Sequence, residues 1–336
     1  MPHVEYDGAA CELRDGETVL DGLLRHGIAV PHACKAGSCG SCMMRAINAG
    51  PPFAAADSAP AALPAEPTAL AVAVTAAQAG LKPAWRAQGY FLACLCKPEG
   101  SLVAAPVGAD VRAAASIVAL ERLTDSVLRV RLAAAAPLDY RSGQFITVLR
   151  GDGLARSYSI ASLPTDDSLE LHVRVLPAGR MSQWLAATAK VGTPIEIQGP
   201  SGDCFYTAGR EDQPLLLAGT GTGLAPLFGI ARDALRQGHR APVHLFHGAL
   251  TAAGLYLQEQ LAQLAAAHSN FRYMPTTLDA DGPMDQAVLR HLGPLKGWRA
   301  FVCGDPAIVQ AFKRKIFLAG AALNDIHADA FLPSAT

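Results

Sequence analysis

The sequence predicts a chain of three domains: an α+β domain, then a small antiparallel β-barrel, then a doubly wound α/β domain with a parallel sheet. Three observations lead to this fold class. Five of the eight cysteines gather between Cys34 and Cys96. Short strands with period-two alternation follow from Ser116, and after Asp212 apolar strands, loops and helices alternate. We place the domains at residues 1–107, 108–210 and 211–336, within the range that 336 residues allow.

Composition excludes several classes of function. Hydrophobic residues make up 51% of the chain, and a net charge of −1 without a long basic run predicts no nucleic-acid partner. The weakly apolar stretch at 67–81 is too short to span roughly 30 Å of hydrocarbon. The first residues lack a basic segment followed by an apolar one, so we expect no signal peptide, no membrane partner and a cytoplasmic location. In that reducing compartment the cysteines should be thiols or metal ligands.

The first domain should begin with a short hairpin and a helix. Helical apolar spacing starts at Thr18 and stops at Gly27. Residues 51–80 are rich in Ala and Pro, which predicts a poorly ordered insertion, although residues 69–79 have helical composition. Residues 89–94 have the pattern of an apolar strand, and we expect residues 100–112 to be a linker.

Cys34, Cys39 and Cys42 have the C-x4-C-x2-C spacing of plant-type [2Fe–2S] ligands. One irregular loop must present three thiolates to a compact two-iron core, and the glycines at 37 and 40 allow that loop to fold tightly. The fourth thiolate must come from Cys94 or Cys96. A zinc site that uses this pair together with two loop cysteines is the alternative.

In the second domain, the segment Arg156-Ser157-Tyr158-Ser159 follows an apolar strand at 144–148. Arg can pair with a diphosphate, Tyr can stack on a flavin ring, and Ser can hydrogen-bond to it. Gly179-Arg180-Met181-Ser182 precedes an expected helix at 183–188. With Ser182 as its N-cap, the start of that helix would be an anion site.

In the third domain, Gly219-Thr220-Gly221-Thr222-Gly223 joins an apolar strand to a helix that ends near Arg236. Glycines there permit close approach of a pyrophosphate, and the helix start supplies N–H groups. A second strand ends in Cys303-Gly304-Asp305. No Lys or Arg occurs between the strand at 243–247 and Arg272, so nothing is placed to pair with a 2′-phosphate, and we predict NADH over NADPH.

These motifs, in this order, resemble the ferredoxin–NAD(P)+ reductase family. With the N-terminal cysteine loop, the chain is similar to the reductase components of bacterial multicomponent oxygenases. The strongest resemblance is to reductases of Rieske-type aromatic-ring dioxygenases, such as those that act on terephthalate. It covers nearly the full chain, including Cys-Lys-Ala-Gly-Ser-Cys-Gly-Ser-Cys, the Leu-x-Cys-x-Cys stretch and the segment at 326–331.

The resemblance implies a β-grasp ferredoxin domain, an FAD-binding barrel and an NAD-binding domain. It favours Cys94 as the fourth ligand, since relatives place that cysteine directly after an apolar strand. It implies that Cys303 lies beside the nicotinamide, with Tyr158 and Ser159 at the flavin. The FAD contacts it implies are Arg156, Ser157, Tyr158, Ser159, His172, Val173, Gly179, Arg180, Met181, Ser182 and Phe331, and the NADH contacts are Gly219, Thr220, Gly221, Thr222, Gly223, Cys303, Gly304 and Asp305.

The implied activity is electron transfer from NADH through FAD and the cluster to a terminal oxygenase, because a flavin can exchange both hydrides and single electrons. Two alternatives remain open in the sequence. The same architecture can serve a diiron monooxygenase such as a phenol hydroxylase. A non-enzymatic iron–sulfur redox sensor would carry the cluster without oxidising NADH.

Overall fold

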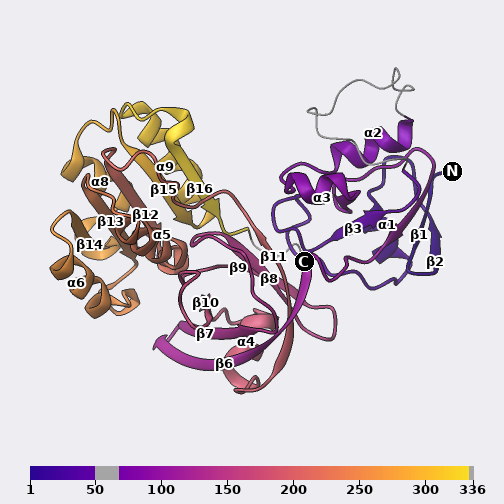
Figure 1. Cartoon of the computed structure of the whole chain (residues 1–336), viewed down its shortest axis with the longest axis horizontal. Helices are drawn as coiled ribbons and strands as arrows, with labels where there is room; N and C mark the ends of the chain where they lie inside the picture. Colours follow the sequence, from indigo (N-terminus) through magenta and orange to yellow (C-terminus); the bar gives the residue numbers. More distant parts are fainter. Residues whose placement is uncertain (50–67, 333–336) are drawn as a thin grey trace.

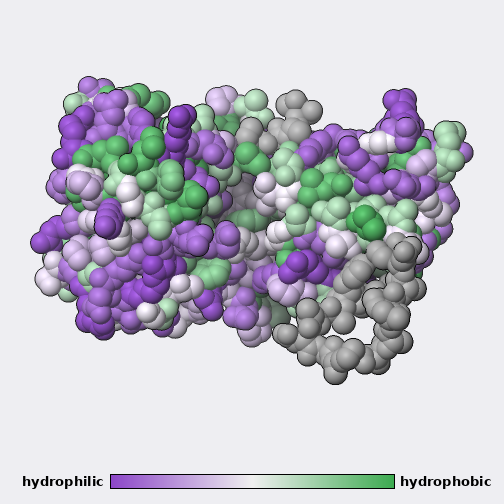
Figure 2. All heavy atoms as spheres, turned by 90° about the horizontal axis from the view of Figure 1, so that it is seen from above, coloured by the Kyte–Doolittle hydropathy of each residue, from purple (hydrophilic) through white to green (hydrophobic). Residues whose placement is uncertain are grey.

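The structure is a computed structural model that describes residues 1–49 and 68–332. Its strands form three sheets, and the sheet of the middle domain lies between the other two (Figure 1). Seen from above, the surface is hollowed between the two outer lobes (Figure 2). The predicted three-domain fold class is confirmed. The boundaries after residues 107 and 210 stay predictions, and no described helix or strand crosses them.

The first domain is a mixed five-stranded sheet, ordered β2-β1-β5-β3-β4, with helices packed against it. The hydroxyl of Thr18 caps the helix that follows the hairpin by accepting from Asp21 N, and the chain leaves that helix at Gly27 with φ +74°. The elements are β1 (His3–Tyr6), β2 (Ala9–Glu12), α1 (Val19–Arg25), β3 (Met43–Ala46), α2 (Ala69–Ala76), α3 (Pro83–Ala87), β4 (Tyr90–Leu92) and β5 (Ser101–Ala105).

The structure corrects one prediction for this domain and describes only part of another. The linker predicted at 100–112 is wrong in its first half, because β5 pairs in parallel with β1 and completes the sheet. The alternation of exposed and buried residues in β5 covers only five residues, which is too short a pattern to predict a strand. Of the predicted insertion at 51–80, the part up to residue 67 lies outside the described residues, while α2 forms where helical composition was noted.

The second domain is a six-stranded antiparallel sheet, ordered β10-β7-β6-β11-β8-β9. A bridge between Ile160 and Leu171 connects its two outer strands, so the sheet closes on itself as a barrel. Its core consists of apolar side chains that alternate along the strands. The elements are β6 (Arg112–Thr124), β7 (Val127–Ala134), β8 (Phe145–Leu149), β9 (Ala155–Ser159), β10 (Leu169–Arg174), α4 (Arg180–Ala187) and β11 (Pro194–Ser201).

The third domain is a parallel sheet, ordered β14-β13-β12-β15-β16, with helices on both faces. Its strand β12 is central and fully apolar at residues 215–218, as a strand covered on both sides requires. The elements are β12 (Leu215–Thr220), α5 (Leu224–Arg236), β13 (Val243–Ala249), α6 (Gln258–Ala267), β14 (Phe271–Thr277), α7 (Leu278–Asp281), α8 (Met284–Leu292), β15 (Arg299–Gly304), α9 (Pro306–Leu318) and β16 (Ile326–Ala330).

Among the described helices, none is both long and apolar enough to cross a membrane.

Candidate functional site

The four predicted cluster cysteines lie together as two pairs of thiols. The Cys34 and Cys39 thiols are hydrogen-bond neighbours, and so are those of Cys42 and Cys94. Cys94 also lies close enough to Cys34 for the two sulfurs to interact electrostatically. Two pairs of thiols are the donor set that a core of two iron atoms requires, with two protein ligands for each iron.

Backbone N–H groups of the loop point at these sulfurs. Ala36 N and Cys39 N each lie 3.4 Å from the Cys34 sulfur, and Gly37 N–H donates to the Cys94 sulfur. Hydrogen bonding with the Cys39 thiol, aided by these amides, lowers the pKa of Cys34 to about 5. The same thiol–thiol hydrogen bond raises the pKa of Cys39, so one thiol of the pair is disposed to ionise, and the amides directed at its sulfur fit a thiolate ligand.

Cys96 lies apart from this group. Its thiol is fully buried, and burial alone raises its pKa to about 12. Within residues 1–49 and 68–332, no group of three or more His, Cys, Asp or Glu side chains is arranged to hold a single metal ion. Because Cys96 lies apart while Cys94 adjoins the loop thiols, the geometry favours Cys94 as fourth ligand over a zinc site that uses both cysteines.

Strand β9 carries the predicted flavin motif, and its residues alternate between two directions. Arg156 and Tyr158 are half-buried on one side, and burial lowers the pKa of Arg156 and raises that of Tyr158. No described carboxylate forms an ion pair with Arg156. A partly desolvated guanidinium without a carboxylate fits a diphosphate. On the other side, Ser157 donates to Cys39 O over 3.2 Å, and Ser159 donates to the Asp329 carboxylate over 2.7 Å.

The helix after β10 starts earlier than the sequence suggested. Gly179 is the N-cap of α4, so Ser182 lies inside the first turn, and its hydroxyl donates back to Gly179 O over 3.1 Å. The prediction of Ser182 as N-cap is therefore wrong. No described side chain caps the helix start, where Arg180 and Met181 stand, and its backbone N–H groups remain available to an anion.

His172 is turned toward the third domain. Its ring is buried between Glu170, 2.9 Å from Nε2, and the Tyr256 hydroxyl, 3.2 Å from Nδ1. Burial lowers the pKa of His172. The contact of His172 and Val173 with a flavin stays a prediction.

The glycine loop packs against β15, and this close packing requires its glycines. A Cβ on Gly223 would lie 2.2 Å from Cys303 O, and one on Gly219 would lie 2.8 Å from Gly223 O. Gly221 has φ +54° and open space beside it. The loop passes into α5 with no described side chain as a cap, and Leu224 N–H donates back to the loop, so the amides at residues 221–223 fit a pyrophosphate.

The carboxyl ends of the parallel strands form a row along one edge of the sheet, and Cys303 lies in the middle of that row. It is the register partner of Gly219 on β12 and of Asp329 on β16. Its buried thiol lies 3.7 Å from the Cys204 thiol, and burial raises its pKa. Asp329 is half-buried, and this desolvation raises its pKa to about 6, while Ser159 links it to the barrel. The carboxyl ends of the strands are the usual place for a nucleotide in such a sheet.

The remaining predicted residues surround this row. The Asp305 carboxylate caps α9 by accepting from Ala307 N over 2.9 Å, so its side chain is already engaged. Phe331 N donates to Gly304 O over 2.8 Å, which holds the aromatic residue beside Cys303. The arrangement brings the β9 motif, the glycine loop and Cys303 to one junction between the second and third domains.

Sequence reasoning missed Asp329. Asp329 stands in the tail segment that carried the resemblance, but no local pattern indicates that it pairs with Ser159, 170 residues earlier. Thr147 and Gln198, which contact the cysteine loop, were missed for the same reason.

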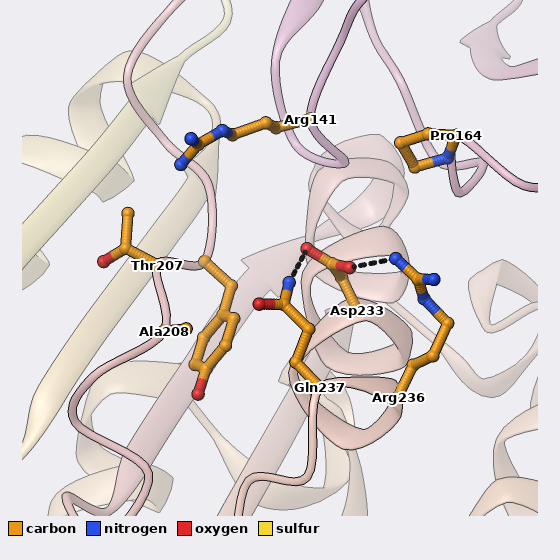
Figure 3. Close-up of a pocket in the computed structure, with 8 residues that line it drawn as sticks. Arg141, Pro164, Thr207, Ala208, Asp233, Arg236 and Gln237 are labelled. Carbon is orange, nitrogen blue, oxygen red and sulfur yellow. Dashed lines mark hydrogen bonds and ion pairs between the residues drawn. The ribbon is translucent and has the colours of Figure 1, made fainter.

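A cavity of about 300 Å³ lies elsewhere, at the far end of α5 (Figure 3). The Asp233 carboxylate in its wall accepts hydrogen bonds from Gln237 and Arg236, and Arg141 lines the cavity from the barrel. None of the predicted site residues lines this cavity.

Profiles of three known families match the chain in the order that the folds suggest. The 2Fe-2S iron-sulfur cluster binding domain matches residues 3–63, the oxidoreductase FAD-binding domain matches residues 115–206, and the oxidoreductase NAD-binding domain matches residues 217–314.

Curated relatives match over almost their whole length. The reductase component of naphthalene 1,2-dioxygenase/salicylate 5-hydroxylase systems from Ralstonia sp. is 32% identical, over 95% of this chain and 94% of its own. Terephthalate 1,2-dioxygenase reductase component 2 from Comamonas sp. is 29% identical, over 99% and 98%. Phenol hydroxylase P5 protein from Acinetobacter pittii is 27% identical, over 99% and 94%.

Among solved structures, a cytochrome P450 reductase from Amycolatopsis superposes with a TM-score of 0.66 at 29% identity, and each chain is covered to 99%. The three domains therefore occur together, in this order, in a protein of known structure.

The residues fit the three groups that these families bind. When bound, FAD accepts a hydride from the nicotinamide and gives up electrons singly, which a [2Fe–2S] cluster can take. The redox-sensor alternative is wrong, because relatives that match end to end are reductases. The chain thus belongs to the ferredoxin–NAD(P)+ reductase components of multicomponent oxygenases that carry an N-terminal [2Fe–2S] domain.

Proposed function

We propose that this reductase uses NADH and delivers electrons to a terminal Rieske-type dioxygenase that hydroxylates an aromatic ring, in a system like that for terephthalate. The observation that carries this proposal is the end-to-end similarity to reductase components of naphthalene and terephthalate dioxygenases. The oxygenase, rather than this chain, would select the aromatic substrate.

The preference for NADH rests on the strand next to the glycine loop. At the end of β13 and just after it, residues 248–251 are Gly, Ala, Leu and Thr, and none carries a positive charge to pair with a 2′-phosphate. The next basic residue, Arg272, is the register partner of His244 near the amino end of β13 and donates to Ser269 O. It therefore lies at the opposite end of the strand from the glycine loop.

Steady-state kinetics with both donors test this preference. We expect kcat/KM for NADH to exceed that for NADPH by about tenfold or more, since one charge-assisted phosphate contact contributes about 1.5–3 kcal/mol. Equal values, or a preference for NADPH, would contradict it.

The partner is tested by reconstitution. The purified reductase is mixed with the oxygenase components of an aromatic-ring dioxygenase and, separately, of a phenol hydroxylase, and hydroxylated product is measured per NADH consumed. We expect coupled product only with the dioxygenase. Coupling to the phenol hydroxylase alone would favour the second candidate, which the relative from Acinetobacter supports.

A further inference from the structure

His172 and Tyr256 form a buried contact between the barrel and the third domain. His172 lies on β10, and Tyr256 stands just before α6, on the other side of the domain boundary. The Tyr256 hydroxyl lies 3.2 Å from His172 Nδ1, and the two rings meet edge to face with their centroids 5.2 Å apart. Both side chains are almost fully buried, so their polar atoms depend on protein partners.

Glu170 determines the direction of this hydrogen bond. Burial acts to raise the pKa of the Glu170 carboxyl, but His172 and two arginines outweigh it and lower the pKa to about 2, so the carboxylate can only accept. It lies 2.9 Å from His172 Nε2, which assigns the proton of the imidazole to Nε2. Burial lowers the pKa of His172, so the ring is neutral at pH 7 and Nδ1 accepts from the Tyr256 hydroxyl.

The same tyrosine contacts the glycine loop. Its hydroxyl lies 3.5 Å from Gly221 O, at the residue where the loop turns with φ +54°. Because the single proton of the hydroxyl goes to His172, this contact is one of packing. The ring of His247 on β13 packs edge to face on Tyr256, with centroids 5.1 Å apart, and interacts with the Gly221 backbone. Two buried side chains of the third domain therefore contact the loop at Gly221.

The contacts of Tyr256 span the boundary that a hydride must cross. Strand β10 of the barrel packs against the glycine loop at residues 221–223. The Cβ position of Gly221 has no atom within 4 Å, so the loop is held at its carbonyl and is open where a Cβ would point. The loop is thus tied to the barrel through Tyr256 without the use of the backbone amides that fit a pyrophosphate.

We propose that Tyr256 is a positioning residue for the dinucleotide. Its hydrogen bond to His172 fixes the glycine loop relative to the barrel, so that the loop presents its amides to the pyrophosphate in one place. Tyr256 acts through Gly221 and is not itself a ligand-binding residue. The inference takes the glycine loop as the pyrophosphate site, and it does not depend on the preference for NADH or on the partner oxygenase.

Two tyrosine variants of the full-length protein, each carrying FAD and the cluster, test the proposal. Tyr256→Phe removes the hydroxyl and keeps the ring. Tyr206→Phe is the matched control, because the Tyr206 hydroxyl also lies 3.2 Å from a histidine Nδ1, that of His239, with the rings edge to face 5.6 Å apart. Tyr206 is equally buried but lines the cavity at the far end of α5. It therefore loses the same kind of bond away from the glycine loop.

Binding of ADP-ribose, which contains the pyrophosphate but no nicotinamide, is measured by titration calorimetry. We expect its dissociation constant to rise about fivefold or more in Tyr256→Phe, equivalent to the ~1 kcal/mol of one neutral hydrogen bond, and to stay within about twofold in Tyr206→Phe. Equal dissociation constants in the two variants would overturn the proposal. Failure of the unmodified protein to bind ADP-ribose would overturn it too, by removing the pyrophosphate site on which it rests.

Anaerobic stopped-flow separates positioning from a general loss of structure. In Tyr256→Phe the NADH concentration that gives half the limiting rate of flavin reduction should rise about as much as the dissociation constant of ADP-ribose. The limiting rate itself should stay within about twofold, because saturating NADH restores the position of the loop. A lower limiting rate with an unchanged half-saturating concentration would contradict the proposal.

Amide hydrogen exchange gives a readout that does not depend on turnover. Exchange at residues 220–224 should be faster in Tyr256→Phe than in Tyr206→Phe, because the loop has lost its link to the barrel. If the affinity for ADP-ribose falls while exchange at the loop is the same in both variants, Tyr256 does not act through the loop and the proposal fails.

Discussion

Cys94 and Cys96 stand two residues apart and have opposite environments. Cys94 touches the Cys42 thiol and receives Gly37 N–H, whereas Cys96 is enclosed in the apolar core of the first domain. The residue pattern leaves both open, since both follow the same apolar strand, and only the family resemblance favoured Cys94. The distinction arises because the turn after β4 directs only the first of them at the loop.

This difference predicts opposite results for two matched variants. Cys94→Ser should lose the visible bands and the electron paramagnetic resonance signal of the cluster, and Cys96→Ser should keep both. FAD content, measured after release from the protein, serves as the control for folding of the rest of the chain. A cluster that survives in Cys94→Ser but not in Cys96→Ser would move the ligand two residues on.

Asp329 makes stability depend on pH. Burial raises its pKa from 3.8 to about 6, so between these values the folded protein holds a proton that the unfolded chain has lost. The contribution of this group to the free energy of unfolding is therefore fully present below about pH 4 and is lost as the pH rises through 6. The loss amounts to about 3 kcal/mol for two pKa units, as an upper bound.

Asp329→Asn cannot titrate and should escape that loss. The Tm of the variant minus the Tm of the unmodified protein should be larger at pH 7.5 than at pH 5. Differential scanning fluorimetry at the two pH values measures it. The same difference at both pH values would mean that Asp329 does not titrate in this range.

At the scale of elements, the glycine loop from β12 to α5 does more than leave room for a ligand. The sequence predicted the strand, the loop and the helix from local pattern, and all three are present. It could not reveal that Gly223 touches Cys303 O, because the two residues meet only when β12 and β15 pair. Likewise, the start of α4 at Gly179 was misplaced because serine is the commoner N-cap.

Gly223→Ala should separate the loop from Cys303 and misplace the nicotinamide. A backbone shift of about 1 Å can cost on the order of 10²-fold in rate, so NADH should reduce the flavin far more slowly while FAD content is kept. Stopped-flow at 450 nm, roughly the flavin maximum, measures this.

Gly238→Asn, at the other end of α5, is the control for folding, because asparagine tolerates the left-handed φ of +79° and nothing lies near its Cβ. If Gly223→Ala reduced its flavin as fast as the unmodified protein, the close contact with Cys303 would not matter for catalysis.

At the scale of the whole molecule, the barrel is the element that brings the sites together. Its strand β9 faces the cysteine loop through Ser157 and the third domain through Ser159. The order of the three domains could be predicted from local patterns in the sequence. The contacts between them could not, since Ser157 and Cys39 are 118 residues apart and polar side chains give no periodic signal.

An anaerobic titration of the purified protein with NADH tests most directly whether one electron path runs through all three domains. Absorbance and electron paramagnetic resonance are followed together. We expect the flavin bands and the iron–sulfur bands both to bleach, with the signal of a reduced [2Fe–2S] cluster appearing as NADH is added. Bleaching of the flavin alone, with the cluster still oxidised at excess NADH, would contradict a path from the nicotinamide to the cysteine loop.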